Sequence, residues 1–166
     1  MIRLLGCLLV LISGVLLGYR RAEEYKARFH VIAALADTLC SLKTDVCVYL
    51  LPFTEALDRA ARGSAETAFF YRNVIEGLNR GEPLSDVWES SAEQISLLST
   101  EDRSTLAALS RQLGQSDTAS QADAFERCID TLRRSAAEQR TASGTGVRLS
   151  LGMGLACGLL LAIVLY

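Results

Sequence analysis

Residues 28–52 read RFHVIAALADTLCSLKTDVCVYLLP, and this stretch decides the fold that the sequence predicts. Its large apolar residues recur at steps of three and four, a spacing that gathers side chains on one face of a helix. The residue before a proline avoids the helical conformation, so Pro52 ends the helix. We therefore predict one long amphipathic helix with its apolar face in a core. The members of that face are Phe29, Ile32, Leu35, Leu39, Leu42, Val46 and Tyr49.

The residues after Pro52 repeat the helical pattern in shorter segments, and none of them alternates as a strand does. Ser99 followed three residues later by Asp102 predicts a capping box. The other boundary residues are Gly63, Ser64, Gly81, Pro83, Gly114 and either Ser116 or Asp117. The expected core residues are Leu57, Ala60, Phe70, Val74, Leu78, Leu84, Val87, Trp88, Leu106, Leu109, Leu113, Phe125, Ile129, Leu132 and Ala136. The predicted fold class is all-α, a compact bundle of about six helices whose first and last members are long and antiparallel.

Charged residues are distributed unevenly along the chain of 166 residues. Residues 4–19 and 149–166 contain none, whereas residues 20–148 hold 16 Lys and Arg against 19 Asp and Glu. At about 1.5 Å per helical residue, the two apolar runs reach roughly 24 and 27 Å, close to the ~30 Å thickness of a bilayer's hydrocarbon core. We predict an N-terminal transmembrane helix over residues 1–19, a cytoplasmic helical-bundle domain over residues 20–148 and a C-terminal transmembrane helix over residues 149–166.

Positive charges flank both apolar runs on the side of the central domain. Arg20 and Arg21 follow the first run, and Arg140 and Arg148 precede the second. Because Lys and Arg concentrate on the cytoplasmic side of membrane helices, the central domain is expected in the cytoplasm. A cleaved signal peptide would carry its charge before the run and a small-x-small site after it, so a retained anchor is the favoured interpretation.

Each apolar run also contains two glycines four residues apart, Gly14 with Gly18 and Gly154 with Gly158. This spacing lets the backbones of membrane helices approach closely, and it favours packing of the two helices on each other or on a partner. Glycine is also common in membrane helices without such a role. The sequence leaves both interpretations open.

Groups that carry out chemistry are scarce in this sequence. Three of its five cysteines lie in the central domain, without the C-x-x-C spacing of a zinc or redox site. The single histidine, His30, has no H-x-x-x-H partner and is expected to be structural or exposed. We predict no catalytic residue, no metal site and no cofactor. The net charge of −3 over residues 20–148 disfavours nucleic acid as a partner.

The order and spacing of four segments resemble the stage III sporulation protein AB family of endospore-forming bacteria. The segments are RLLG at residues 3–6, LPFTEAL at residues 51–57, LGQSD at residues 113–117 with Gln121 after it, and the closing apolar run. That family is in turn similar to the cytoplasmic helical domain of the type II secretion F protein and the type IV pilus platform protein, which bind a secretion ATPase.

The resemblance implies a non-enzymatic membrane platform subunit of a secretion-like channel complex between mother cell and forespore. Its partners would be a cytoplasmic secretion-type ATPase similar to stage III sporulation protein AA, other membrane proteins of the complex and the lipid bilayer; a homo-oligomer stays open. The chain would lie in the outer forespore membrane, on the mother-cell side, with two spans. The alternative is a membrane-anchored helical signalling, sensor or scaffold module.

Exposed charges near the turns of the domain are the expected contacts with such an ATPase. We predict Arg59, Arg62, Glu82 and Asp86 as the partner-binding residues. Protein surfaces ordinarily carry mixed charges. The assignment of these four residues as ATPase contacts therefore rests on the resemblance to the family and not on a sequence motif.

Overall fold

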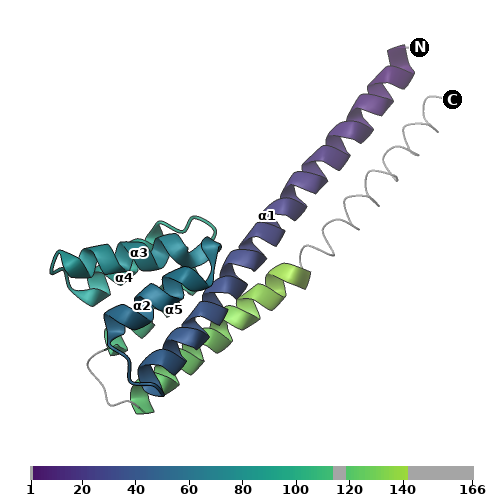
Figure 1. The fold of residues 1–166 in the computed structure, drawn as a ribbon. Coiled ribbons are helices and arrows are strands. Elements are labelled where there is room, and N and C mark those ends of the chain that lie inside the picture. The colour runs from purple at the N-terminus through teal and green to yellow at the C-terminus, as the bar shows by residue number, and fades with distance from the viewer. Residues whose placement is uncertain (1, 114–118, 142–166) are drawn as a thin grey trace. The chain divides into compact units, whose positions relative to one another are not determined.

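A computed structural model of the chain describes residues 2–113 and 119–141, with side chains from residue 23 onward. It contains the helices α1 (Ile2–Cys47), α2 (Phe53–Gly63), α3 (Ala65–Asn79), α4 (Leu84–Glu93) and α5 (Thr100–Gln112). A sixth helix covers residues 119–141 (Figure 1). The described residues form no strand, so the predicted all-α bundle of six helices is confirmed.

The chain divides into two compact units. Arg28–Ala137 forms one unit, which we call the bundle. The other unit consists of Met1–Ala27 and Glu138–Tyr166, of which residues 2–27 and 138–141 are described and are helical.

Both predicted membrane segments belong to this second unit. Residues 2–19 are helical but their side chains lie outside the described part, and residues 149–166 lie outside the described residues altogether. Where the structure does describe the chain, no helix combines the length and the apolar character needed to cross a bilayer. The two spans therefore stay predictions.

The framework of the bundle is an antiparallel pair formed by α1 and the helix over residues 119–141 (Figure 1). Lys43 Nζ lies 2.6 Å from Glu126 Oε1, and Arg133 Nη2 lies 3.8 Å from Asp37 Oδ1. Residue numbers rise along one helix as they fall along the other, so the predicted antiparallel arrangement is confirmed. Both apolar stripes are buried, with Ile32, Leu35, Leu39 and Leu42 on α1 and Phe125, Ile129, Leu132 and Ala136 on the last helix.

Three aromatic side chains from α3 and α4 pack together in the core. The ring of Phe70 stands edge to face with Tyr71 and with Trp88, at centroid distances of 5.0 and 4.9 Å. Such pairs contribute about 0.5–1.5 kcal/mol beyond the area they bury. The hydroxyl of Tyr71 also reaches α1, where it lies 2.9 Å from Thr38 Oγ1. This buried hydrogen bond ties α3 to the framework.

Helix α5 begins at the capping box that the sequence predicts. The amide of Asp102 donates to Ser99 Oγ, and the amide of Ser99 donates to Asp102 Oδ2, both at 3.1 Å. The Asp102 side chain is buried, and together with Ser99 it provides hydrogen-bond acceptors for backbone amides at the start of α5. Ser64 occupies the expected N-cap position of α3, but its hydroxyl bonds to the Glu66 carboxylate and caps no backbone amide.

The end of α1 differs from the prediction. The helix ends at Cys47, before Pro52 is reached, and Tyr49 is 67% exposed. The assignment of Tyr49 to the buried face is therefore wrong. Helical periodicity states which face a residue would occupy if the helix continued, and it carries no information on where the helix leaves the core.

Helix α3 approaches α4 closely at Gly77. A Cβ atom at this position would lie 2.6 Å from Val87 Cγ2 and 3.0 Å from Val87 Cβ. The side chain of Val87 is buried, and its branched Cβ restricts its rotation, so it has little room to move aside. The distance between α3 and α4 thus depends on a residue without a side chain.

We expect Gly77→Ala to lower the free energy of unfolding by about 1–3 kcal/mol, because the added methyl group overpacks this contact. Urea unfolding followed by far-UV circular dichroism measures the effect. Gly63→Ala is the matched control, since its Cβ would meet only Thr38 Cγ2 at 3.5 Å. Gly77→Ala should cost less stability in a Val87→Ala background than in the unaltered chain, and an equal cost in both backgrounds would contradict the proposed contact.

Candidate functional site

An apolar turn between α1 and α2 distinguishes the surface of the bundle. Val48, Tyr49 and Leu50 expose 66%, 67% and 72% of their surface, and we call these three residues the α1–α2 turn. Single exposed apolar residues are ordinary on soluble proteins, whereas contiguous ones mark interaction surfaces. The other large apolar residue exposed in the described part is Phe69 on α3, at 58%. It stands alone.

Three backbone hydrogen bonds close the α1–α2 turn onto the last turn of α1. The amides of Val48 and Tyr49 both donate to the carbonyl of Thr44, at 3.0 and 3.1 Å. The amide of Leu51 donates to the carbonyl of Asp45 at 3.0 Å. These bonds fix the backbone path of the turn against the end of α1.

The backbone at Leu50 is strained. Its φ angle is 52°, in the left-handed region that glycine or asparagine usually occupies where a helix ends. For a residue with a Cβ atom this conformation costs roughly 1–2 kcal/mol. The exposed leucine side chain recovers little of that cost by packing. Strain of this kind is concentrated at functional sites, and here it coincides with the apolar patch.

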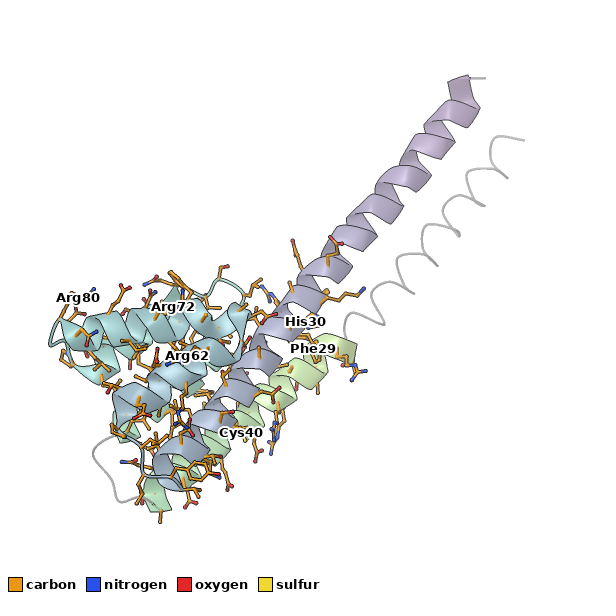
Figure 2. All side chains as sticks on the ribbon, in the orientation of Figure 1. Phe29, His30, Cys40, Arg62, Arg72 and Arg80 are labelled. Atoms are coloured by element: carbon orange, nitrogen blue, oxygen red, sulfur yellow. The ribbon has the colours of Figure 1, made fainter. Side chains whose placement is uncertain are left out.

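Charged residues of α1 and α2 form the rim of the turn. Arg59 Nη1 lies 3.7 Å from Asp45 Oδ1, and Arg59 Nη2 lies 3.4 Å from Glu55 Oε1. Arg62, one helical turn further along α2, is paired with Asp58 (Figure 2). The structure thus places one predicted partner-binding residue, Arg59, beside the turn, and both arginines are engaged by carboxylates of the bundle.

The two acidic members of the predicted set lie at the connection between α3 and α4. Arg80 Nε donates to Glu82 at 2.6 Å, and Asp86 lies in the first turn of α4, where it accepts from Ser85 (Figure 2). In the described part of the chain, the four predicted residues make no ion pair or hydrogen bond with one another. They form two separate charged regions, and their role in binding stays a prediction.

The glycine pairs belong to the unit outside the bundle. Gly14 and Gly18 lie in α1, in the segment without described side chains, and Gly154 and Gly158 lie outside the described residues. Their packing stays a prediction as well.

Two buried groups of the bundle, the Cys128 thiol and the Tyr71 hydroxyl, have raised pKa values. Burial raises the pKa of the Cys128 thiol to about 12, and the charge of nearby Asp102 acts in the same direction. Burial also raises the pKa of the Tyr71 hydroxyl, against the opposing hydrogen bond with Thr38. A reactive thiol needs a lowered pKa, so Cys128 is a packing residue.

The described residues bring together no three side chains that would hold a metal ion. His30 is exposed and stands edge to face with Phe29, with the ring centroids 5.4 Å apart (Figure 2). An open hollow of about 240 Å³ lies between α5 and the helix over residues 119–141, where Arg127 donates to Gln112. Ligand pockets usually hold about 300–1,000 Å³, so this hollow is small for a ligand site.

The described residues define an all-α helical bundle that carries one exposed apolar turn. The family model of stage III sporulation protein AB matches residues 3–166, so this chain belongs to that family and the resemblance seen in the sequence is confirmed. A solved structure titled "Stage III sporulation protein AB (SpoIIIAB)" has a similar fold, with a TM-score of 0.64 and 22% identity. The match covers 71% of this chain and 97% of that one. No curated protein sequence gives a match.

The sequence contains a second indication of the α1–α2 turn, which is independent of the helical periodicity. Residues 48–51 read VYLL, four consecutive apolar residues directly before a proline. One face of an amphipathic helix cannot bury four consecutive residues, because neighbours point about 100° apart. Such a run therefore leaves apolar surface exposed near the end of the helix. The run at residues 48–51 thus indicates the exposed α1–α2 turn.

Removing the strain at Leu50 should not destabilise the bundle. Leu50→Gly and Leu50→Ala remove the same exposed side chain, but only glycine adopts a φ of 52° without cost. We expect Leu50→Gly to be about 1 kcal/mol more stable than Leu50→Ala in urea unfolding. Equal stabilities, or a less stable glycine variant, would contradict strain at this residue.

The free energy of unfolding should fall as pH rises above about 9. In the unfolded chain a thiol titrates near 8.5 and a phenol near 10, whereas the folded bundle holds both protons to higher pH at Cys128 and Tyr71. The folded state then binds more protons, and stability drops by at most about 1.4 kcal/mol per pH unit for each group. Cys128→Ala and Tyr71→Phe should each flatten the decline measured by urea unfolding between about pH 9 and 12. An unchanged slope in both variants would show that other groups control it.

Proposed function

We propose that this chain is a non-enzymatic membrane platform subunit of the channel complex that forms between mother cell and forespore, and that it docks a cytoplasmic secretion-type ATPase. The observation that carries the proposal is membership of the stage III sporulation protein AB family over residues 3–166. The similar fold of a solved member of that family supports it.

The physical character of the bundle is consistent with a platform. Its two long antiparallel helices are packed along buried apolar stripes, and a buried hydrogen bond between Tyr71 and Thr38 connects them to the shorter helices. A rigid support transmits force and position, and it needs no reactive group. The raised pKa of Cys128 is typical of a packing residue rather than of a nucleophile.

The proposed location follows from the apolar ends of the chain. Residues 1–19 and 149–166 would cross the outer forespore membrane, with the bundle on the cytoplasmic side in the mother cell. The bundle would there meet an ATPase similar to stage III sporulation protein AA, and the membrane segments would meet the other membrane proteins of the complex. Arg59, Arg62, Glu82 and Asp86 are proposed as contacts with the ATPase.

The full chain in lipid nanodiscs should bind the purified stage III sporulation protein AA-like ATPase of the same organism with a dissociation constant in the micromolar range or below. Biolayer interferometry on immobilised nanodiscs measures this affinity, and empty nanodiscs are the control. Changing Arg59, Arg62, Glu82 and Asp86 together to alanine should weaken binding.

Two results would count against parts of this proposal. If the four-residue variant bound as tightly as the unaltered chain, the function would stand and these contacts would be discarded. If the unaltered chain neither bound the ATPase nor changed its turnover, even with the other membrane proteins of the complex present, the platform function itself would be rejected.

A further inference from the structure

We propose that the α1–α2 turn is a plug that inserts into an apolar pocket with a basic rim on the ATPase. This inference rests on the proposed function and gives it a location. Val48, Tyr49 and Leu50 would fill the pocket, and the charged residues around the turn would meet its rim. The charged residues predicted as ATPase contacts do not include any residue of this plug.

Exposure and backbone strain coincide at the α1–α2 turn. Each of the three side chains exposes about two thirds of its surface or more, although the bundle buries large apolar residues elsewhere, Trp88 and Phe70 among them. A chain that needed only a turn here would carry glycine at position 50, where φ is 52°. The leucine destabilises the isolated bundle and is placed outside its core. Its side chain is useful only if another surface covers it.

The shape of the turn suits insertion into a recess. Three consecutive side chains are largely exposed, and the backbone bonds from Tyr49 to Thr44 and from Leu51 to Asp45 fix the backbone that carries them. A preorganised projection binds a recess with little loss of conformational entropy. Apolar and aromatic anchors in a fitted pocket carry most of the binding energy at protein interfaces.

The shape of the turn disfavours a two-fold contact between the turns of two copies of this chain. A two-fold interface brings the same patch of each copy together and requires that patch to be self-complementary. Two projecting turns do not fill each other. Three side chains also offer well under the ~800 Å² per partner that a standard interface buries. The occupant is therefore a recess on a different protein, and other contacts of the complex supply the remaining area.

The charged residues beside the turn carry more negative than positive charge. Asp45 and Glu55 both lie within 4 Å of the Arg59 guanidinium, at 3.7 and 3.4 Å. Two carboxylates share one cation, so the rim carries a net negative charge beside the turn. Complementary potentials across an interface raise the association rate and exclude wrong partners. A pocket rimmed by Lys or Arg is the complement of this surface.

The test compares two variants of the full chain in nanodiscs, with the AA-like ATPase as the probe. Tyr49→Ser combined with Leu50→Asn removes two of the three apolar side chains of the plug, and asparagine tolerates the left-handed backbone at position 50, so the bundle should stay folded. Phe69→Ser is the control, because it removes another largely exposed apolar side chain, from α3. The nearby bond from Tyr71 to Thr38 places this part of α3 about 15 Å along α1 from Val48.

We expect the double variant to raise the dissociation constant for the ATPase about tenfold or more, while Phe69→Ser changes it less than about threefold. Circular dichroism and the urea midpoint should show both variants folded. Raising the salt concentration should slow association of the unaltered chain, because the rim and the pocket attract each other over a distance.

Three outcomes would overturn the inference. If the ATPase bound the unaltered chain and the double variant equally well, the platform function would stand and the plug would be wrong. If the double variant instead changed the oligomeric state of the chain, measured by mass photometry in nanodiscs, a second copy would cover the turn. If the ATPase did not bind the unaltered chain at all, the plug would fall together with the proposed function.

Discussion

The antiparallel packing of α1 against the helix over residues 119–141 is the contact on which the rest of the bundle depends. A single helix is marginally stable in water, and its stability in a protein comes from burying one face. Leu35 and Leu39 on one helix and Phe125 and Leu132 on the other are buried along this seam. The ion pair between Lys43 and Glu126 marks the register at the surface, where such pairs contribute little energy. The hydrogen bond from Tyr71 to Thr38 then ties α3 to this pair, and α4 packs on α3 through Phe70 and Trp88.

The α1–α2 turn is the most prominent exposed apolar feature among the described residues of the bundle. Elsewhere the aromatic rings of Phe70 and Trp88 pack edge to face, the α5 cap is reciprocal, and the exposed Arg59 and Arg62 are matched by carboxylates. The α1–α2 turn breaks this pattern twice, with an apolar surface left open and with a leucine in a glycine-like conformation. Natural sequences that violate local rules at one place commonly do so where they function.

A binding role that depended on the paired arginines would have to break existing ion pairs. Arg59 is held by Asp45 and Glu55, and Arg62 by Asp58, so a partner gains only the difference between the new and the old contacts. Apolar side chains that are already exposed lose no such contacts on binding. For this reason the turn is the stronger candidate for the centre of an interface, with the charges as its rim.

The sequence by itself determined the helical class, the stripe residues and the capping box at Ser99, because these features follow from periodicity and from contacts three or four residues apart. The family was also evident from the order of the motifs. The sequence did not reveal that Gly77 sets the distance to Val87, or that Tyr49 leaves the core, because both facts depend on which helix lies opposite. Arg59 was a candidate from its charge alone, but only the tertiary structure joined it to Asp45 beside an exposed apolar turn. Local patterns specify elements, whereas a surface is made by residues that folding brings together from different elements.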